Sequence, residues 1–303
     1  MVEQSVTFPG GTSVSHLRVY DWPAPDAPGG SGTPHFHTTS TEAYVVVGGR
    51  GRVETLGPQG WASHGLVPGR IVWFSPGVIH RAINDGGLEV LVLMSNAGLP
   101  EAGDAVFTFP PEVLASQDAY ARAAALPAPS PRTDDAPPAE HGRLRVDDAS
   151  VAERDPLRGD DALPPGGRPP GAPSSGTSSD TPLNPLDDMA QDPAVAAAAL
   201  ARRDLALEGY RALRAAVRDD GPTALEPLWA AAARLVAGRT AGWREVWTAS
   251  VGRALRETDA ALAALAEADP ATLTRGAVAS IDASPGPRRY GMCGRLRVFP
   301  SGQ

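Results

Sequence analysis

Lysine is absent from this sequence: all 27 basic residues are arginine. Schiff-base catalysis and the phosphate-binding P-loop both need a lysine, so both are excluded. The single cysteine, Cys293, has no partner for a disulfide, which fits a reducing compartment. We find no run of about 18 apolar residues and no basic, apolar leader at the start. We therefore expect a soluble, cytoplasmic protein without a membrane partner.

Negative charge outweighs positive charge in this chain. The formal net charge is -8, whereas affinity for nucleic acid needs clustered basic side chains that neutralise phosphates. We therefore expect no nucleic-acid partner.

Proline and glycine are abundant, with 31 and 33 residues in a chain of 303. Their distribution predicts three regions. Residues 1–127 indicate a β domain that ends in a short helical appendage, and residues 192–303 indicate a helical domain with a strand-like tail. Between them, residues 128–191 are rich in Pro, Gly, Ser and Asp and nearly lack aromatic residues, which predicts a flexible linker.

Short runs rich in β-branched and aromatic residues, separated by turn residues, predict the strands of the first region. These runs are VSHLRVYDW, EAYVVVGGRGRVETLG, GRIVWFSPG, HRAIN and LEVLVLMSN. The tripeptide Leu-Arg-Val occurs at 17–19, 144–146 and 296–298. Chance accounts for this in a chain rich in Arg and Val, although strand-like pieces that add to a sheet edge would show the same pattern.

The helical region has clear end signals. Asp192 is a good N-cap, Pro193 suits the first helical position, and Gly221 closes the first helix. A second helical run follows from about residue 223 to 270, in which Gly238 and Gly242 are candidate breaks.

Three of the six histidines suggest a metal site. In an extended strand, alternate side chains share a face, so His35 and His37 point the same way. Glu42 begins the next strand after a turn, and His80 follows a Pro-Gly turn further on. Three imidazoles and one carboxylate suit a single divalent ion of Fe, Mn, Zn, Ni or Co and leave coordination positions open.

The spacing of these residues resembles that of the cupin superfamily. The first cupin motif is matched at Gly29, His35, His37, Glu42 and Gly49. The second motif is matched at Gly69, Gly77, His80 and Asn84, but Ser75 stands where the family has proline, which is displaced to Pro76. The resemblance covers roughly residues 10 to 97. It implies a small antiparallel barrel, the double-stranded β-helix or jelly roll, with the metal deep inside and often a homodimer through the barrel.

Further pocket residues follow from strand alternation. Tyr44 lies beside Glu42 and either moves a proton or fills the barrel. Of Trp73 and Phe74, one must point inward, and Trp73 is our candidate for binding substrate. Arg52 and Arg81 are further candidates for binding substrate, although solvated arginines would show the same pattern.

The resemblance leaves two functions open. The first is a metal-dependent enzyme, dioxygenase-type or an isomerase or epimerase, that acts on a small oxygen-rich molecule. The second is a non-catalytic sensor that binds a small molecule in the barrel and contacts a protein partner through its helices. Such a contact would use an aromatic face built from Trp229, Trp243 and Trp247. A DNA-binding version is disfavoured, because no short helix with a basic recognition face is visible.

Overall fold

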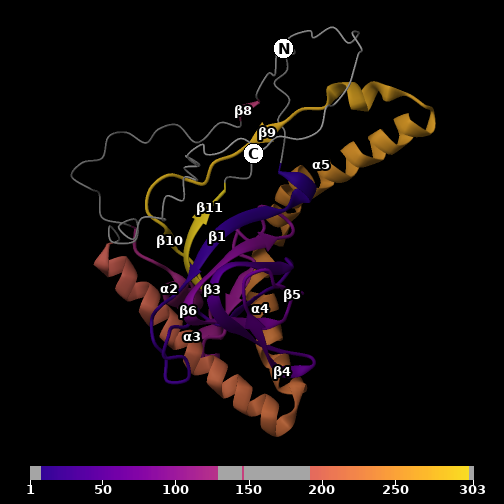
Figure 1. The fold of residues 1–303 in the computed structure, drawn as a ribbon. Coiled ribbons are helices and arrows are strands. Elements are labelled where there is room, and N and C mark those ends of the chain that lie inside the picture. The colour runs from indigo at the N-terminus through magenta and orange to yellow at the C-terminus, as the bar shows by residue number, and fades with distance from the viewer. Residues whose placement is uncertain (1–7, 129–144, 147–191, 300–303) are drawn as a thin grey trace, which may run out of the picture.

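The computed structural model describes residues 8–128, 145–146 and 192–299 (Figure 1). Antiparallel strands form the first half and helices dominate the second, which confirms the predicted fold classes. None of the helices described is long and apolar enough to cross a membrane. Most of the predicted linker, residues 129–144 and 147–191, lies outside the described residues.

A nine-stranded sheet curves into the barrel. After a short 3-10 turn, η1 (Pro9–Gly11), its strands are β1 (Ser13–Val19), β2 (His35–His37), β3 (Glu42–Gly57), β4 (Gly60–Leu66), β5 (Ile71–Phe74), β6 (Ile79–Met94), β7 (Ala105–Phe107), β10 (Arg289–Tyr290) and β11 (Gly294–Val298). A separate two-stranded sheet pairs β8 (Arg145–Val146) with β9 (Ala279–Ser280).

The long strands β3 and β6 form the backbone of the barrel. They pair antiparallel along their whole length, and the register shifts between Val46 and Gly51. At the shift, Gly49 adopts a φ of 65°, and a Cβ there would collide with the main chain of Gly87. Only glycine fits this position, and the bulge bends both strands so that the sheet can curve.

The helices are α1 (Pro111–Leu114), α2 (Gln117–Ala124), α3 (Pro193–Asp220), α4 (Glu226–Val236) and α5 (Thr240–Ala266), with 3-10 turns η3 (Pro222–Leu225), η4 (Ala237–Arg239) and η5 (Pro270–Arg275). The predicted ends of α3 are confirmed: the Asp192 side chain accepts a hydrogen bond from the Ala194 amide, and Gly221 follows with a φ of 82°. The second run breaks at η4, which contains Gly238, whereas α5 continues through Gly242.

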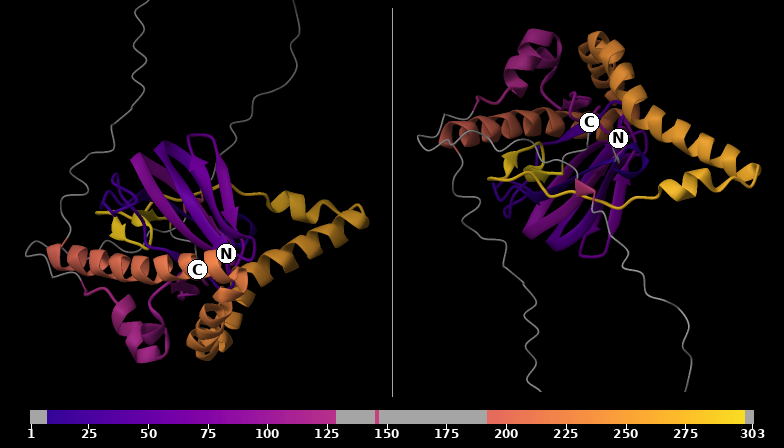
Figure 2. Two further views of the ribbon diagram at one scale, coloured as in Figure 1. Left: turned by 90° about the horizontal axis from the view of Figure 1, so that it is seen from below. Right: turned by 90° about the horizontal axis from the view of Figure 1, so that it is seen from above.

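The helices share a core with the strands. They lie along one side of the sheet, and no described helix covers the other side (Figure 2). Phe36, Leu56 and Ile79 of the strands belong to the same buried cluster as Ala206 and Leu228 of the helices. A second cluster, which includes Leu17, Tyr44, Val90 and Cys293, fills the barrel itself.

The tail returns to the barrel rather than staying with the helices. Strand β11 pairs antiparallel with β1, and Leu296 lies opposite Leu17, so two of the three Leu-Arg-Val segments are neighbours in one sheet. The boundaries 1–127, 128–191 and 192–303 stay a prediction. Among the described residues, however, the first and third regions share both a sheet and a core.

Candidate metal centre

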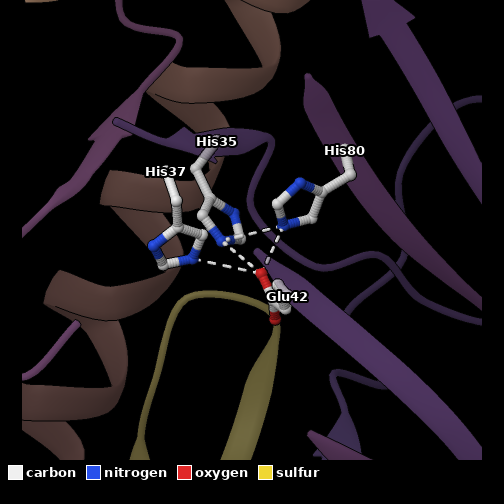
Figure 3. A group of neighbouring side chains, drawn as sticks. All are labelled: His35, His37, Glu42 and His80. Atoms are coloured by element: carbon white, nitrogen blue, oxygen red, sulfur yellow. Dashed lines mark hydrogen bonds and ion pairs between the residues drawn. The ribbon is translucent and has the colours of Figure 1, made fainter. Parts of the chain in front are cut away.

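Four buried side chains point toward one another (Figure 3). We call them the ligand set: His35 and His37 from β2, Glu42 from the start of β3 and His80 from the start of β6. All four are at most 5% exposed, and one donor atom from each lies within 4.8 Å of the others. Direct pairing of His35 with His80 between β2 and β6 brings the two sequence motifs together.

Hydrogen bonds to the outer ring nitrogens determine how the histidines are protonated. His35 Nδ1 lies 2.9 Å from the Thr33 carbonyl oxygen, and His80 Nδ1 lies 3.1 Å from that of Val78. His37 Nδ1 lies 2.6 Å from Oδ1 of Asp104. Carbonyl and carboxylate oxygens only accept, so each Nδ1 carries the proton. In a neutral ring, the Nε2 lone pair is then free to bind a metal.

The Nε2 atoms converge on the Glu42 carboxylate. Glu42 Oε2 lies 2.8 Å from Nε2 of His80 and 3.1 Å from Nε2 of His37, and the Nε2 atoms of His35 and His80 are 3.2 Å apart. His37 Nε2 and Glu42 Oε2 have no well-formed hydrogen bond to any described residue. A cation between these electron-rich atoms would satisfy them all, and the donor set fits a divalent transition metal.

The charges of the centre are strongly coupled. Burial on its own would raise the pKa of Glu42, but the neighbouring His80 and His37 hold it well below its usual range. Burial drives the pKa of His35 well below its ordinary value. Burial also lowers the pKa of His37, but the neighbouring carboxylates of Asp104 and Glu42 outweigh this effect and raise the pKa to about 10. The carboxylates of Asp104 and Glu42 therefore favour positive charge at the centre, and a metal ion would also supply it.

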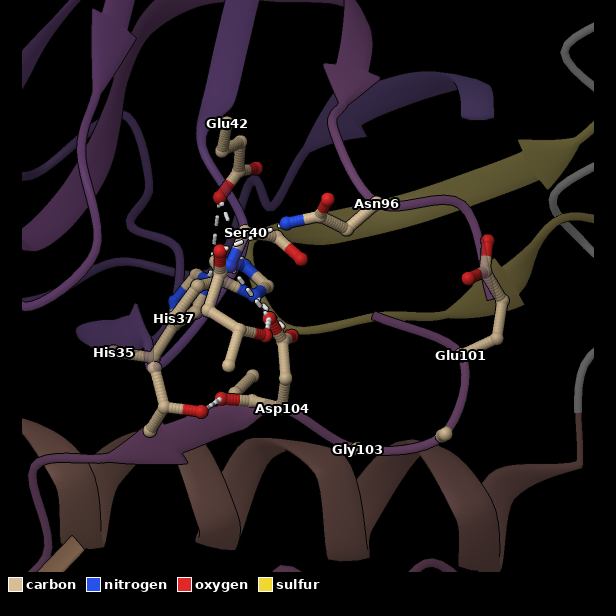
Figure 4. A network of polar contacts seen from close by, with 12 residues as sticks. His35, His37, Ser40, Glu42, Asn96, Glu101, Gly103 and Asp104 are labelled. Atoms are coloured by element: carbon tan, nitrogen blue, oxygen red, sulfur yellow. Dashed lines mark hydrogen bonds and ion pairs between the residues drawn. The ribbon is translucent and has the colours of Figure 1, made fainter. Parts of the chain in front are cut away.

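Asp104 was not predicted from the sequence, although it orients the His37 ring. Its other carboxylate oxygen, Oδ2, accepts hydrogen bonds from the Thr39 hydroxyl at 2.9 Å and the Ser40 amide at 3.0 Å, so it also ties down the turn before Glu42 (Figure 4). Asp104 lies 67 positions from His37 and just before β7. No local spacing could have revealed it, because only the pairing of β2 with β7 brings it near.

The turn before His80 forms despite its departure from the cupin motif. The Val78 amide donates to the Ser75 carbonyl oxygen at 3.2 Å, which closes a four-residue turn. Pro76 occupies its second position, and Gly77, with a φ of 84°, its third, as a type II turn requires. The Gly77 amide donates to the His37 carbonyl oxygen at 2.9 Å, which ties the turn to β2.

A cavity of about 270 Å³ opens over the centre and is lined by three of the ligand set. Cys293 also lines it, and sequence analysis did not place this residue at the site. Its Sγ lies 3.8 Å from His35 Nδ1. Burial raises the pKa of the thiol to about 12, so it is neutral at physiological pH.

Tyr44 lies next to the centre but is fully buried. Its hydroxyl donates to Cys293 Sγ at 3.3 Å, and its ring packs edge-on against Phe74 and His80. Burial raises its pKa well above the ordinary value, so the phenol keeps its proton and is not available as a base. Its surroundings favour the packing role over the proton-transfer role.

The three predicted substrate-binding residues lie away from the cavity. Trp73 is on the outer face of the sheet and 69% exposed. Phe74 takes the inward position instead, with its ring stacked 4.5 Å from that of His80. Arg81 is fully buried and bound to Asp26 and Ser31, and Arg52 pairs with Asp85 near the surface.

Strand alternation explains these positions. Phe74, two residues from Val72 on β5, faces the core, so Trp73 must face outward. Arg81 follows His80 directly and therefore points to the opposite face, where α3 and the loop before β2 cover it. Neither arginine is among the residues that line the cavity.

Comparisons with known proteins agree with the fold. A family model described as "Cupin domain" matches residues 26–95. No curated protein matches the chain. Among solved structures, the chain is similar to the capsular polysaccharide assembling protein CapF from Staphylococcus aureus, with 22% identity, a TM-score of 0.27, and coverage of 34% of this chain and 28% of CapF.

Two other solved structures show similar local matches. The DMSP lyase DddQ from Ruegeria pomeroyi is 22% identical, with a TM-score of 0.23 and coverage of 28% of this chain and 39% of that one. The vicilin from Solanum melongena is 20% identical, with a TM-score of 0.21 and coverage of 22% and 21%. The chain thus spans well under half the length of each of these three proteins.

Proposed function

Residues 26–95 of this chain form a cupin domain, and we propose that it makes the protein a metal-dependent enzyme acting on a small molecule. The proposal places one divalent transition-metal ion at the ligand set. One observation carries it: with every Nδ1 proton given to an acceptor, three Nε2 atoms turn toward one buried carboxylate. When bound, the metal supplies Lewis-acid chemistry, or redox chemistry if it is iron.

Within the enzyme class, we favour a dioxygenase-type reaction over an isomerase or epimerase. An isomerase or epimerase needs a side chain that moves a proton to and from the substrate. Outside the ligand set, the ionisable side chains among the described residues that line the cavity are Cys293, a neutral buried thiol, and Glu101, an exposed residue at the mouth. Neither is poised as a base over the centre.

The sensor alternative receives no support from the tryptophans. Each indole N–H holds a helix to a barrel loop: Trp229 to the Gly77 carbonyl at 3.0 Å, Trp243 to the Ala102 carbonyl at 3.3 Å and Trp247 to the Asn96 side chain at 3.1 Å. They dock the helices on the barrel instead of forming a free aromatic face. A homodimer through the barrel and a cytoplasmic location stay predictions.

Elemental analysis of purified wild type, His37→Ala and His64→Ala tests the metal site. His64 is an exposed histidine on β4 and serves as the matched control. We expect about one metal ion per chain in wild type and His64→Ala, and a large loss in His37→Ala. Equal metal content in all three proteins would overturn the site.

Oxygen consumption then tests the reaction class. Protein loaded with Fe(II) or Zn(II) is supplied with a panel of catechols, 1,3-diketones and thiols in an oxygen electrode. We expect uptake only from the Fe(II) form and with only part of the panel. Product formation by the Zn(II) form without oxygen uptake would favour the isomerase or epimerase class.

A further inference from the structure

The walls of the cavity above the ligand set are mostly apolar, although Ser13 and Ser15 of β1 also line it. Leu17, Val92 and Met94 of the barrel line one part, and Met292, Leu296 and Val298 of the tail line another. The tail therefore forms a substantial part of the apolar wall. This wall lies more than 200 positions from the cupin motifs in sequence, so the cupin domain alone does not make the pocket.

No described residue that lines the cavity is an arginine, and the chain has no lysine. The Cys293 thiol that lines the cavity is buried. Glu101, the remaining ionisable residue outside the ligand set, is an exposed acidic side chain. An anionic group on the part of the ligand that lies beyond reach of the metal would lose its hydration without gaining a cationic side chain as partner, so the cavity disfavours it.

The tail wall is held firmly in place. Strand β11 pairs with β1 over five residue pairs, and the Tyr20 amide donates to the Cys293 carbonyl oxygen at 3.2 Å. The backbones also approach closely: a Cβ on Gly32 would lie 2.8 Å from the Cys293 Cα. Met292 and Leu296 are thus fixed features of the pocket and can discriminate between ligands.

We propose that the ligand of this site has one metal-chelating polar end and a small, uncharged, apolar body, and that Leu296 and Met292 of the tail select for that body. This inference rests on the proposed function, because the chelating end needs the metal. A cavity of about 270 Å³ is near the lower limit for ligand pockets, about 300 Å³. The body is therefore short.

Straight-chain alkyl hydroxamates, from acetohydroxamate to octanohydroxamate, probe this directly. Each carries the same chelating group on a lengthening apolar chain. Binding to the Co(II)-loaded protein is followed through the visible spectrum of the metal. We expect the dissociation constant to fall about fourfold per added methylene and then to stop falling once the cavity is full.

Charge and the tail are tested in the same assay. A hydroxamate whose chain ends in a carboxylate should bind at least tenfold more weakly than the alkyl hydroxamate of equal length. Leu296→Ala should weaken the longer probes severalfold and leave acetohydroxamate unchanged. Leu273→Ala is the matched control, because Leu273 lies exposed on η5 and does not line the cavity. Leu296→Met, which keeps the wall apolar, should behave nearly as wild type.

The outcomes separate the two proposals. A protein that takes up no Co(II), or whose spectrum does not respond to acetohydroxamate, contradicts the proposed function. A protein that binds acetohydroxamate with no dependence on chain length, or that accepts the carboxylate-ended probe equally well, overturns only the present inference. If Leu296→Ala does not fold, the wild-type series still decides the ligand class, and Leu296→Met against Met292→Ala decides the role of the tail.

Discussion

Each histidine of the ligand set gives its Nδ1 proton to an acceptor, but the acceptors differ in strength. His35 and His80 donate to main-chain carbonyls two positions away, whereas His37 donates to the buried carboxylate of Asp104. A carboxylate acceptor increases the basicity of the ring and fixes its orientation more strongly than a carbonyl does. Metal binding by His37 should therefore depend on the acceptor of its Nδ1 proton more than metal binding by His35 or His80 does.

Replacement of Asp104 by asparagine tests this. The amide keeps the shape of the side chain but removes the charge, so we expect metal affinity to fall by about 10- to 100-fold while the fold is retained. Competition with a chromogenic chelator measures the affinity, and circular dichroism checks the fold. Asp118→Asn, an exposed change on α2, is the control. Equal affinity in Asp104→Asn and wild type would show that Asp104 only shapes the turn.

A second prediction concerns pH. Asp26 accepts two hydrogen bonds from the buried Arg81, at 2.7 and 2.9 Å, and these hold its pKa at about 2 instead of 3.8. Because the folded-state pKa is lowered, the stabilisation is present above pH 3.8 and is lost as the pH falls toward 2. The Asp26 side chain is 40% exposed, so we expect a contribution of only about 1 kcal/mol.

Urea unfolding of the metal-free protein as a function of pH measures this contribution. The difference in stability between wild type and Asp26→Asn should be constant from pH 8 to 5, about one unit above the ordinary aspartate pKa, and shrink below pH 4. Asp118→Asn should show no such difference. A gap between wild type and Asp26→Asn that persists unchanged at the lowest pH would contradict the assignment.

Prediction from sequence worked at the residue scale where the interaction was local. The clustering of the four side chains was predictable, because strand alternation places His35 and His37 on one face and motif spacing adds Glu42 and His80. Their role as metal ligands stays a prediction. Asp104 and Cys293 were not, because they reach the site through strand pairings that join distant segments. Alternation could show that one of Trp73 and Phe74 points inward, but not which one, because both are aromatic.

At the scale of elements, the effect of the turn before His80 on metal affinity can be measured separately from its effect on the stability of the protein. Gly77 and Gly60 both have a φ of 84°, and a Cβ on either would meet no atom closer than 3.7 Å. Alanine at either position should therefore cost a similar amount, about 1–2 kcal/mol, from the left-handed conformation alone.

Only one of the two substitutions should affect the metal. Gly60 closes the β3–β4 hairpin, whereas the Gly77 turn leads directly into His80 and is bonded to His37. We expect Gly77→Ala to lower metal affinity and Gly60→Ala to leave it unchanged. Chelator competition and urea unfolding on both variants give the comparison. Equal metal affinity in the two variants would mean that the turn does not position His80.

Strands were predictable where their own residues are strongly apolar. The bounds of β3 match the predicted run. The predicted runs HRAIN and LEVLVLMSN are instead parts of one strand, β6. This strand continues through Gly86 and Gly87 because it stays paired with β3. Strand β4 was missed, since GWASHGL has little β-forming character of its own. Antiparallel pairing with β3 in a hairpin holds this segment in the extended conformation.

For the whole molecule, composition predicted three regions but not how they pack. The helices carry clear end signals in the sequence, but nothing local indicates which barrel surface they cover. The shared core and the β1–β11 pairing arise from contacts between segments hundreds of residues apart. Such contacts leave no periodic pattern in either segment.

Limited proteolysis tests this arrangement. The composition of residues 128–191 predicts that the first cuts fall there. Independent domains would come apart as two fragments, whereas the shared sheet and core predict that the nicked halves stay together in native buffer and separate only in denaturant. Gel filtration followed by mass spectrometry measures this. Two fragments that elute separately without denaturant would show that the regions are independent domains.

The pairing of β1 with β11 joins residues near 17 to residues near 296. A contact across so much of the chain is slow to form, because the cost of closing the loop must be met before the contact stabilises it. During synthesis, the strands that carry all four ligands leave the ribosome long before Leu296 does. A growing chain can thus bring its metal ligands together while one wall of the pocket is still missing. Any metal bound at that stage would be exposed to water and to the chelators of the cell until the tail has been synthesised.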